Sequence, residues 1–499
     1  MSSAAHFEVV VIGAGPGGYV SAIRAAQDGF KTAIIEGHKM GGECLNYGCI
    51  PSKALITSGH LIDKIRDAGK QGIHIPSLEV DLSKMIDWKG GIVKALTGGI
   101  SQLLKANGVT SFQGTGKFDG FLSSDMRVKK LKVVAHEDSW DGTPVKAGQD
   151  EAYITADRVI IASGSEIMQP GTLKIDGKHL LGSRDALDVR EIPKKIVVIG
   201  GGFIGLEIGT FFSKLDSEVV VVEALPQILT GTDRECVDVV QKKLVKSGVQ
   251  IKTETKVLSV KGSADGTLVE VETKDGKKEI IKCDWALLSV GRRPRTKNLN
   301  LESIDLKTTD RGFITVNARL ETSVPGVFAI GDVIGGAMLA HKASKEGLVC
   351  VEGFKNPNVS MNVKALPWAI FVDPEIATVG HTEESARAAG WDPVVGKCPF
   401  SANGRALTTG ESTGFVKLIA DRKTDRLLGA HMVGPEVSNL IAEVAAFIEM
   451  GGTAQDLART IHAHPTLPET IMEAAENIHG MAIHFFDKKK ATRAPEVHT

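Results

Sequence analysis

The sequence is poor in cysteine and lacks long apolar runs, and each shortage excludes a class of protein. Six cysteines occur among 499 residues, and only Cys44 and Cys49 are close neighbours. So sparse a set excludes the disulfide framework of a small secreted domain and favours one special pair in a reducing compartment. Charge or glycine interrupts every apolar run well before about 18 residues, which excludes a transmembrane helix.

An excess of charge of either sign is also missing. Lys and Arg number 59, and Asp and Glu number 60. No net field therefore exists to hold nucleic acid or an anionic membrane, and we expect neither as a partner. The first predicted strand begins near Glu8 and leaves no room for a signal or transit peptide. We therefore expect an intracellular protein of the cytoplasm or the mitochondrial matrix.

An internal repeat is the most informative feature that is present. The stretch from Val9 to Glu36 returns as Ile196 to Glu223, with the same offset of 187 residues throughout. Each copy has an apolar run, a glycine cluster, a helical stretch and a second apolar run that ends in glutamate. This pattern predicts two nucleotide-binding βαβ units, and hence an α/β fold with two Rossmann-like domains.

In the first copy, Gly13, Gly15 and Gly18 follow a strand and precede a helix. The first two glycines permit a tight turn and close approach of backbone N–H groups to a pyrophosphate, and the third lets the helix pack on the strand. Glu36 ends the next strand, where a carboxylate can bind ribose hydroxyls. A glycine-rich turn without a ligand is the competing interpretation, and these flanks disfavour it.

The second copy predicts a second dinucleotide. Gly200, Gly202 and Gly205 come with Glu223, whose carboxylate would accept the 2′-hydroxyl of NAD but repel the 2′-phosphate of NADP. NAD is therefore the predicted ligand. Two dinucleotide sites in one chain imply that one cofactor stays bound while the other exchanges.

The cysteine pair supplies a third redox centre. Cys44 and Cys49 could close a small disulfide loop just before a predicted helix start at residues 50–53. Backbone dipoles at a helix N-terminus stabilise a thiolate and lower its pKa, which makes the thiol reactive. Half of a zinc site is the alternative, but no second pair of Cys or His ligands has suitable spacing.

Three stretches carry a family resemblance. Residues 41–53, Gly-Gly-Glu-Cys-Leu-Asn-Tyr-Gly-Cys-Ile-Pro-Ser-Lys, resemble the redox-disulfide motif of the class I pyridine nucleotide disulfide oxidoreductases. Residues 329–332, Ala-Ile-Gly-Asp, resemble their second FAD motif. Residues 462–469, His-Ala-His-Pro-Thr-Leu-Pro-Glu, are similar to the C-terminal signature of the dihydrolipoamide dehydrogenases in that family. The motifs stand in the family's order, and the resemblance covers nearly the whole chain.

The resemblance implies roles for single residues. Cys44 would exchange with a dithiol substrate, and Cys49 would contact the flavin. His464 would act as the base, oriented by Glu469, and would reach the disulfide of the partner subunit in a homodimer. From spacing alone, His462 and His464 could equally be ordinary loop histidines.

The same resemblance extends to both cofactor sites. Lys53 and Glu207 match an ion pair near the flavin, and Asp332 matches the residue that binds its ribityl chain. The predicted FAD-binding set is Gly13, Gly15, Gly18, Glu36, Lys53, Gly331, Asp332, Met338, Ala340 and His341. The predicted NAD-binding set is Gly200, Gly202, Gly205, Glu223 and Gly291.

The implied enzyme oxidises dihydrolipoamide to lipoamide and reduces NAD through the disulfide and FAD. Its substrate would be the free molecule or a lipoyl-bearing protein, such as that of a 2-oxo acid or acetoin dehydrogenase complex. The implied domains are FAD-binding (1–160), NAD-binding (161–290), a central domain completing the FAD site (291–360) and an α+β dimer-interface domain (361–499).

Two other functions stay open at this point. The chain could be an NADH-dependent disulfide reductase or diaphorase with another acceptor, or a flavoprotein kept as a structural subunit of a larger complex. His464 discriminates between them and the dithiol enzyme. Flavin reduction by NADH needs no thiol base, and a scaffold needs neither this base nor the cysteine pair.

Two residues beside the cysteines depart from the family pattern. Glu43 stands where the family has a small Thr, and Tyr47 replaces a small aliphatic residue. An acidic group near Cys44 should raise the pKa of that thiol, and Tyr47 would narrow the approach of a substrate. The hypothesis is an altered substrate preference or rate.

Overall fold

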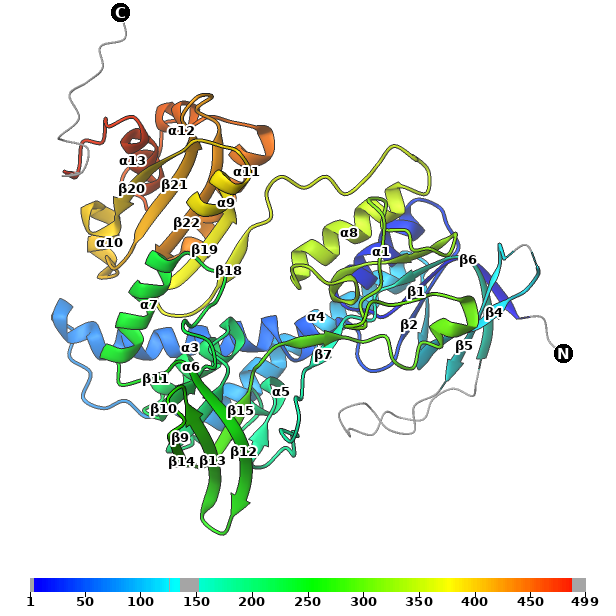
Figure 1. Cartoon of the computed structure of the whole chain (residues 1–499), viewed down its shortest axis with the longest axis horizontal. Helices are drawn as coiled ribbons and strands as arrows, with labels where there is room; N and C mark the ends of the chain where they lie inside the picture. Colours follow the sequence, from blue (N-terminus) through cyan, green and yellow to red (C-terminus); the bar gives the residue numbers. More distant parts are fainter. Residues whose placement is uncertain (1–3, 125, 135–151, 487–499) are drawn as a thin grey trace, which may run out of the picture. The chain divides into compact units, whose positions relative to one another are not determined.

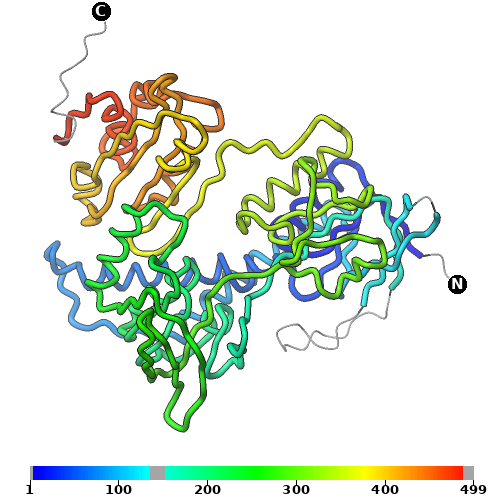
Figure 2. The backbone as a smooth tube through the Cα atoms, viewed as in Figure 1, coloured from blue at the N-terminus to red at the C-terminus, as the bar shows by residue number. Residues whose placement is uncertain are grey.

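A computed structural model describes residues 4–124, 126–134 and 152–486 (Figure 1). The chain forms two compact units, one of residues 1–192 and 288–362 and the other of residues 193–287 and 363–499. Figure 2 lets the reader follow the chain as it passes between them. None of the helices in the described ranges has the length and apolarity needed to cross a membrane.

A mostly parallel sheet forms the centre of the first unit. Its order is β3-β2-β1-β6-β5-β4, and β17 also pairs with β6. The bounds are β1 (Ala5–Ile12), β2 (Thr32–Glu36), β3 (Thr110–Gln113), β4 (Thr115–Phe121), β5 (Lys129–Val134), β6 (Ala152–Ile161) and β17 (Val327–Ala329). The first strand starts earlier than predicted, because its ladder with β6 already begins at Ala5, opposite Ile154.

Both faces of this sheet are buried. On β1, Val9 and Val11 pack with Ala22 of α1, whereas the alternate residue Val10 packs with Phe118 on the other face. Successive side chains point to opposite faces, and both faces are buried, so the four residues from Val9 to Ile12 are all apolar. Helices α1 and α8 lie together along one face (Figure 1).

The helices and minor strands of the first unit complete it. The helices are α1 (Pro16–Gln27), α2 (Gly42–Asn46), α3 (Cys49–Asp67), α4 (Leu82–Ala106), α5 (Ser183–Ala186) and α8 (Ala340–Glu352), with 3₁₀ turns at Ala68–Gln71, Leu301–Ile304 and Gly331–Ile334. The minor strands are β7 (Ser165–Ile167), β8 (Leu180–Leu181) and β16 (Arg292–Pro294). Strands β7 and β16 pair antiparallel.

The second unit begins with the second copy of the repeat. Its sheet has the order β11-β10-β9-β15, with the pairs among the first three strands parallel. The bounds are β9 (Lys195–Ile199), α6 (Phe203–Lys214), β10 (Glu218–Val222), α7 (Arg234–Lys246), β11 (Gln250–Lys252) and β15 (Trp285–Leu288). An antiparallel meander follows β11: β12 (Thr255–Ser263), β13 (Gly266–Thr273) and β14 (Lys278–Cys283).

The C-terminal part of this unit is an antiparallel sheet with helices. The strands β18 (Trp368–Ile370), β19 (Glu375–Gly380), β22 (Leu427–Gly434), β21 (Phe415–Asp421) and β20 (Pro393–Pro399) are adjacent in that order. The helices are α9 (Glu383–Ala388), α10 (Gly404–Thr409), α11 (Val437–Met450), α12 (Ala454–Arg459) and α13 (Glu469–Ile478), with a 3₁₀ turn at Phe400–Ala402. The predicted α/β class, with two Rossmann-like sheets and an α+β C-terminal part, is confirmed.

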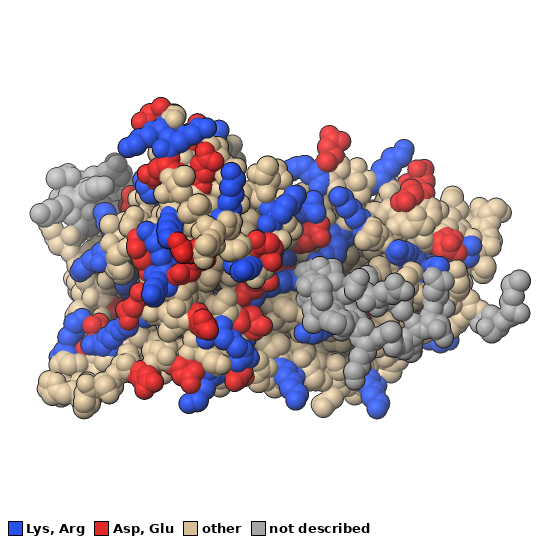
Figure 3. Space-filling view, turned by 90° about the horizontal axis from the view of Figure 1, so that it is seen from below, with Lys and Arg blue, Asp and Glu red and all other residues tan. Residues whose placement is uncertain are grey.

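Charges on the surface are mixed. On the face drawn in Figure 3, basic and acidic side chains alternate over short distances. This agrees with the near-zero net charge of the sequence.

Candidate functional site

The two glycine–glutamate motifs have the same local geometry. Glu36 accepts backbone N–H bonds from Ala14 (2.7 Å) and His38 (2.8 Å). Glu223 accepts the equivalent bonds from Gly201 (2.6 Å) and Leu225 (2.8 Å). Each carboxylate therefore fixes its glycine loop beside the end of the second strand, where the ribose of a bound dinucleotide would lie.

The glycines leave room for a pyrophosphate. Gly13 has φ +100°, and a Cβ there would lie 2.3 Å from the carbonyl oxygen of Ala162. A Cβ on Gly18 would lie 1.8 Å from the carbonyl oxygen of Gly13. Helix α1 can therefore approach the end of β1 this closely only with glycine at position 18. By contrast, a Cβ on Gly15 would meet nothing within 4 Å.

Within the part of the chain that the structure describes, the start of helix α1 beside that open space has no side-chain cap. Gly15 is its N-cap residue and supplies no side-chain cap to the first N–H groups. Gly202 has the same role on α6, and a Cβ there would also meet open space. Uncapped N–H groups at a helix start suit an anionic diphosphate, so both sites fit a dinucleotide.

The cysteine pair joins two consecutive helices. Cys44 lies within the short helix α2, and Cys49 is the first residue of α3 after the N-cap Gly48. Cys44 is half-buried and Cys49 is exposed. The helix start predicted at residues 50–53 is thus confirmed, one residue earlier.

The pKa of Cys44 is raised, the direction expected from an acidic neighbour and opposite to any lowering by helix dipoles. The main causes are its hydrogen bond with Cys49, burial and the charge that Cys49 can carry. Lys53 lowers this pKa and Asp332 raises it. Four predicted site residues, Cys44, Cys49, Lys53 and Asp332, therefore lie near one another here.

The expected effect of Glu43 on Cys44 also needs correction. The carboxylate of Glu43 accepts a 3.0 Å bond from Nε of Arg184 and a second, shorter one from Nη2. Nη2 of Arg292 lies 3.6 Å away. Two guanidinium groups thus neutralise Glu43, and the raised pKa of Cys44 has the causes named above instead.

Tyr47 is held among cationic and polar groups. Its hydroxyl forms a hydrogen bond with Nε2 of His38, and the two rings stack with centroids 5.4 Å apart. The guanidinium carbon of Arg184 lies 4.5 Å from the centre of the Tyr47 ring, and Nζ of Lys39 lies 5.4 Å from it.

A hydrogen-bond chain leads from this cluster to Asp332. Nε of Arg292 donates to the Ser165 hydroxyl (2.7 Å), which donates to Asp332 (2.5 Å). The neighbouring Gly331 donates its N–H to the buried carboxylate of Glu346 (2.7 Å). Arg184, Arg292 and Ser165 were not predicted as site residues, because each is far along the chain from its partner.

The second unit holds the predicted base. Nδ1 of His464 lies 2.8 Å from Oε1 of Glu469, whose other oxygen accepts the Thr466 N–H (2.7 Å). Burial would raise the pKa of Glu469, but the bonds from Thr466 and His464 lower it overall. His464 is 79% exposed. The nearby His462 is bonded to Glu443 instead, at 2.8 Å.

The remaining predicted residues are placed as follows. Met338 precedes α8, Ala340 begins it, and His341 follows in its first turn. Gly291 is in the first unit, where its carbonyl accepts the Met168 N–H (3.0 Å). Glu207 is buried on α6 and accepts the Phe371 N–H (2.9 Å). Lys53 and Glu207 lie in different units, so their pairing stays a prediction.

A metal centre finds no support within the described ranges. There, no group of three or more His, Cys, Asp or Glu side chains could hold a metal ion.

Comparisons with known proteins agree with this geometry. Residues 7–347 match the pyridine nucleotide-disulphide oxidoreductase family, and residues 366–475 match the dimerisation domain of that family. Dihydrolipoyl dehydrogenase from Haloferax volcanii is 45% identical over 96% of this chain and 98% of its own length. The human mitochondrial dihydrolipoyl dehydrogenase is 42% identical over 94% of this chain and 89% of its own.

Solved structures show the same fold. LpdA from Mycobacterium tuberculosis superposes with a TM-score of 0.85 at 26% identity, over 94% of this chain and 99% of that one. The flavoprotein disulfide reductase RclA from Escherichia coli gives 0.81 at 25% identity, over 95% and 99%. With the repeated dinucleotide sites and the cysteine pair in place, the chain belongs to the pyridine nucleotide-disulphide oxidoreductase family.

Proposed function

We propose that the chain is a dihydrolipoyl dehydrogenase, which converts dihydrolipoamide and NAD⁺ into lipoamide, NADH and a proton. The observation that carries the proposal is the His464–Glu469 pair, with Glu469 fixed by the Thr466 N–H. An enzyme that only passed electrons from NADH to an acceptor would have no need of this oriented base. The names of its relatives agree with the substrate.

Members of the family use FAD and NAD, and the two glycine–glutamate sites each fit a dinucleotide. FAD, when bound, carries the electron pair between the dithiol and the nicotinamide. The proposed FAD residues are those of the first unit, with Asp332 held by Ser165. Glu223 selects NAD, because its carboxylate would repel a 2′-phosphate.

The chain's own residues carry the thiol chemistry. His464 takes a proton from one substrate thiol, and the resulting thiolate attacks Cys44, so that a substrate–Cys44 disulfide forms while the Cys44–Cys49 bond breaks and Cys49 leaves as a thiolate. The second substrate thiol then attacks the first substrate sulfur and displaces Cys44, which closes lipoamide. Its proton and the one that His464 holds pass to Cys44 and Cys49, which leaves the pair as a dithiol. Glu469 holds the imidazole so that its other nitrogen faces the substrate, and supports the charged form.

The dimerisation domain supports a homodimer. We propose that His464 serves the disulfide of the partner subunit. The proposed domains are FAD-binding (1–160), NAD-binding (161–290), central (291–360) and dimer-interface (361–499). The lipoyl group would come free or on a carrier protein of a 2-oxo acid or acetoin dehydrogenase complex.

Steady-state kinetics of the purified holoenzyme tests this function. NADH production from dihydrolipoamide should be specific for NAD⁺ over NADP⁺ and should vanish in Cys44→Ser. His464→Gln should lower this rate roughly 10²- to 10⁴-fold, while NADH oxidation by ferricyanide, which needs no thiol base, should persist. His462→Gln is the matched control, since that histidine is bonded to Glu443. Equal losses in both histidine variants would refute the assignment of the base.

A further inference from the structure

Arg292 and Arg293 are neighbours on strand β16, yet they lie in different surroundings. Strand β16 pairs antiparallel with β7, and successive side chains of a strand point to opposite faces. The side chain of Arg292 is 13% exposed and binds the buried Ser165. That of Arg293 is 46% exposed and binds Glu166 at 2.7 Å. Arg292 is therefore the arginine that reaches the hydrogen-bond chain ending at Asp332.

Arg292 binds two groups of Ser165 at once. Its Nε donates to the hydroxyl (2.7 Å) and its Nη2 donates to the backbone carbonyl oxygen (3.0 Å). The Nη2 atom also lies 3.6 Å from the carboxylate of Glu43, which supplies a counter-charge. Because the donors of a guanidinium have a fixed planar arrangement, two bonds to one residue hold the hydroxyl and the arginine in one relative position.

The chemistry of the three groups sets the direction of each hydrogen bond. A guanidinium only donates, a carboxylate only accepts, and a serine hydroxyl has a single hydrogen. The Ser165 oxygen therefore accepts from Arg292 and gives its hydrogen to Oδ2 of Asp332. Without the guanidinium, the hydroxyl could turn about its C–O bond and point its hydrogen elsewhere. Arg292 thus determines that Ser165 serves as a donor to Asp332.

The backbone beside Asp332 is fixed independently of Ser165. The N–H of Gly331 donates to the buried carboxylate of Glu346 (2.7 Å), whose other oxygen lies 2.5 Å from Nζ of Lys342. The orientation of the Asp332 side chain is then what the Ser165 bond decides. This bond engages Oδ2, so Oδ1 of the half-buried Asp332 is the oxygen that can accept from a ligand.

We propose that Arg292 is a positioning residue of the FAD site: through Ser165 it fixes the carboxylate of Asp332, so that Oδ1 accepts a hydroxyl of the ribityl chain of the bound cofactor. A carboxylate held in one orientation beforehand loses little freedom when FAD binds, which raises the affinity. The inference rests on the proposed FAD site, and the thiol chemistry of His464 does not enter it.

The dissociation constant of FAD tests this role. The holoenzyme is diluted in steps, free FAD is separated by ultrafiltration, and its fluorescence is measured. Arg292→Met should raise the dissociation constant about tenfold, as the loss of one hydrogen bond to a charged group would. Arg293→Met is the matched control, and it should leave the dissociation constant unchanged. Equal rises in the two variants would overturn the proposal.

A double-mutant cycle shows whether Arg292 acts through the hydroxyl. Ser165→Ala should raise the dissociation constant by about the same factor as Arg292→Met, and the double variant should show little further rise. If the two losses multiplied, Arg292 would support the site by another route and the proposal would be refuted. A merely structural role of Arg292 would lower the melting temperature and leave the two effects on FAD binding independent.

Arg292→Lys keeps the test decisive if Arg292→Met fails to fold. Lysine retains the charge but lacks the planar pair of donors, so the dissociation constant should still rise, by less than about tenfold. A wild-type value would contradict the proposal, because the charge alone would then suffice.

Asp332→Asn separates this inference from the proposed function. This variant should raise the dissociation constant roughly 10- to 100-fold, because it removes the charged acceptor itself. If it binds FAD as tightly as the wild type does, the assignment of Asp332 to the FAD site is wrong, and the inference fails with it. If Asp332→Asn weakens binding but Arg292→Met and Ser165→Ala do not, the FAD site stands and only the positioning role of Arg292 is refuted.

Discussion

The N–H of Gly201 donates a 2.6 Å hydrogen bond to Glu223. The N–H of Ala14, 187 residues earlier in the chain, donates the equivalent 2.7 Å bond to Glu36. The two motifs are thus a matched pair for a test of cofactor assignment. Glu223→Gln should weaken NAD⁺ binding by about 1.5–3 kcal/mol, a rise in KM of roughly 10- to 100-fold. It should also narrow the preference over NADP⁺, since the repelling charge is gone.

Glu36→Gln provides the reciprocal control. This variant should lose FAD on dilution while the KM for NAD⁺ of the remaining holoenzyme stays constant. Fluorescence of released flavin and initial rates at graded NAD⁺ give both readouts. If each variant affected both cofactors equally, the two sites would not be separate as assigned.

The orientation of His464 by Glu469 predicts a graded loss. Glu469→Gln keeps the size of the side chain but removes the charge that supports the imidazolium. It should lower the rate of dihydrolipoamide oxidation, by less than the roughly 10²- to 10⁴-fold expected for loss of the base itself. NADH oxidation by ferricyanide should be unaffected. A ferricyanide rate that fell in parallel would indicate a fold defect instead.

Much of both dinucleotide sites could be predicted from the sequence, because a contiguous motif sets its own backbone. Gly13, Glu36 and their repeats lie within one βαβ unit, and local spacing fixes where the carboxylate meets the loop. The start of β1 was predicted less well. Its start depends on pairing with β6, about 150 positions away in the chain, and local apolar periodicity ends before that contact begins.

The surroundings of the cysteine pair could not be predicted. Glu43 and Arg184 are 141 positions apart, and Ser165 and Asp332 are 167 apart. A single arginine on a four-residue helix has no periodicity and resembles a solvent-exposed charge. The raised pKa of Cys44 was predicted from Glu43, but its main causes are the neighbouring Cys49 and burial, which spacing along the chain does not reveal.

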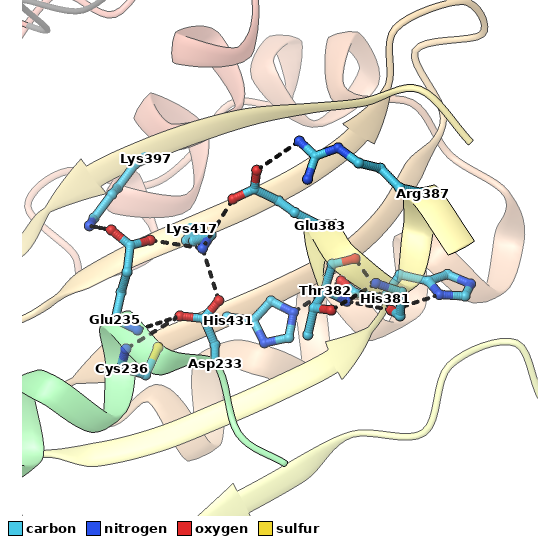
Figure 4. A network of polar contacts seen from close by, with 11 residues as sticks. Asp233, Glu235, Cys236, His381, Thr382, Glu383, Arg387, Lys397, Lys417 and His431 are labelled. Carbon is cyan, nitrogen blue, oxygen red and sulfur yellow. Dashed lines mark hydrogen bonds and ion pairs between the residues drawn. The ribbon is translucent and has the colours of Figure 1, made fainter. Parts of the chain in front are cut away.

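Lys417 is the centre of a buried ion-pair network in the second unit, shown in Figure 4. Its Nζ lies 2.8 Å from Asp233, 2.8 Å from Glu235 and 3.4 Å from Glu383. Its side chain is 5% exposed and that of Asp233 is 8% exposed. Because Asp233 also caps helix α7, Lys417 on β21 ties that helix to the C-terminal sheet.

Lys417→Met should therefore lower the free energy of unfolding by about 3–5 kcal/mol, since it leaves a buried carboxylate without its cation. Lys397 offers a matched control in the same network. It binds Glu235 at 2.9 Å but is 36% exposed, so Lys397→Met should cost under about 1 kcal/mol. Urea unfolding of both variants measures the difference. Similar costs would mean that burial does not determine the strength of this network.

Acid should weaken the second unit through Asp373. Burial alone would raise the pKa of this carboxyl, but Lys214, 2.7 Å away, and Lys243 outweigh it and hold the pKa at about 2. The folded pKa thus lies below the unfolded value of about 3.9. The unfolded state then takes up the proton first as pH falls, so stability is complete above about pH 4 and is lost toward pH 2.

Asp373→Asn should remove this dependence, which amounts to about 2 kcal/mol between pH 4 and pH 2. The variant should be less stable at neutral pH, because Lys214 is left buried without its carboxylate, and its stability should fall less steeply in acid. Asp265→Asn is the control. That carboxylate is 81% exposed and 3.7 Å from Lys282, so its loss should leave the dependence of the free energy of unfolding on pH unchanged. An unchanged acid slope in Asp373→Asn would mean that other carboxylates, Glu235 among them, dominate acid unfolding.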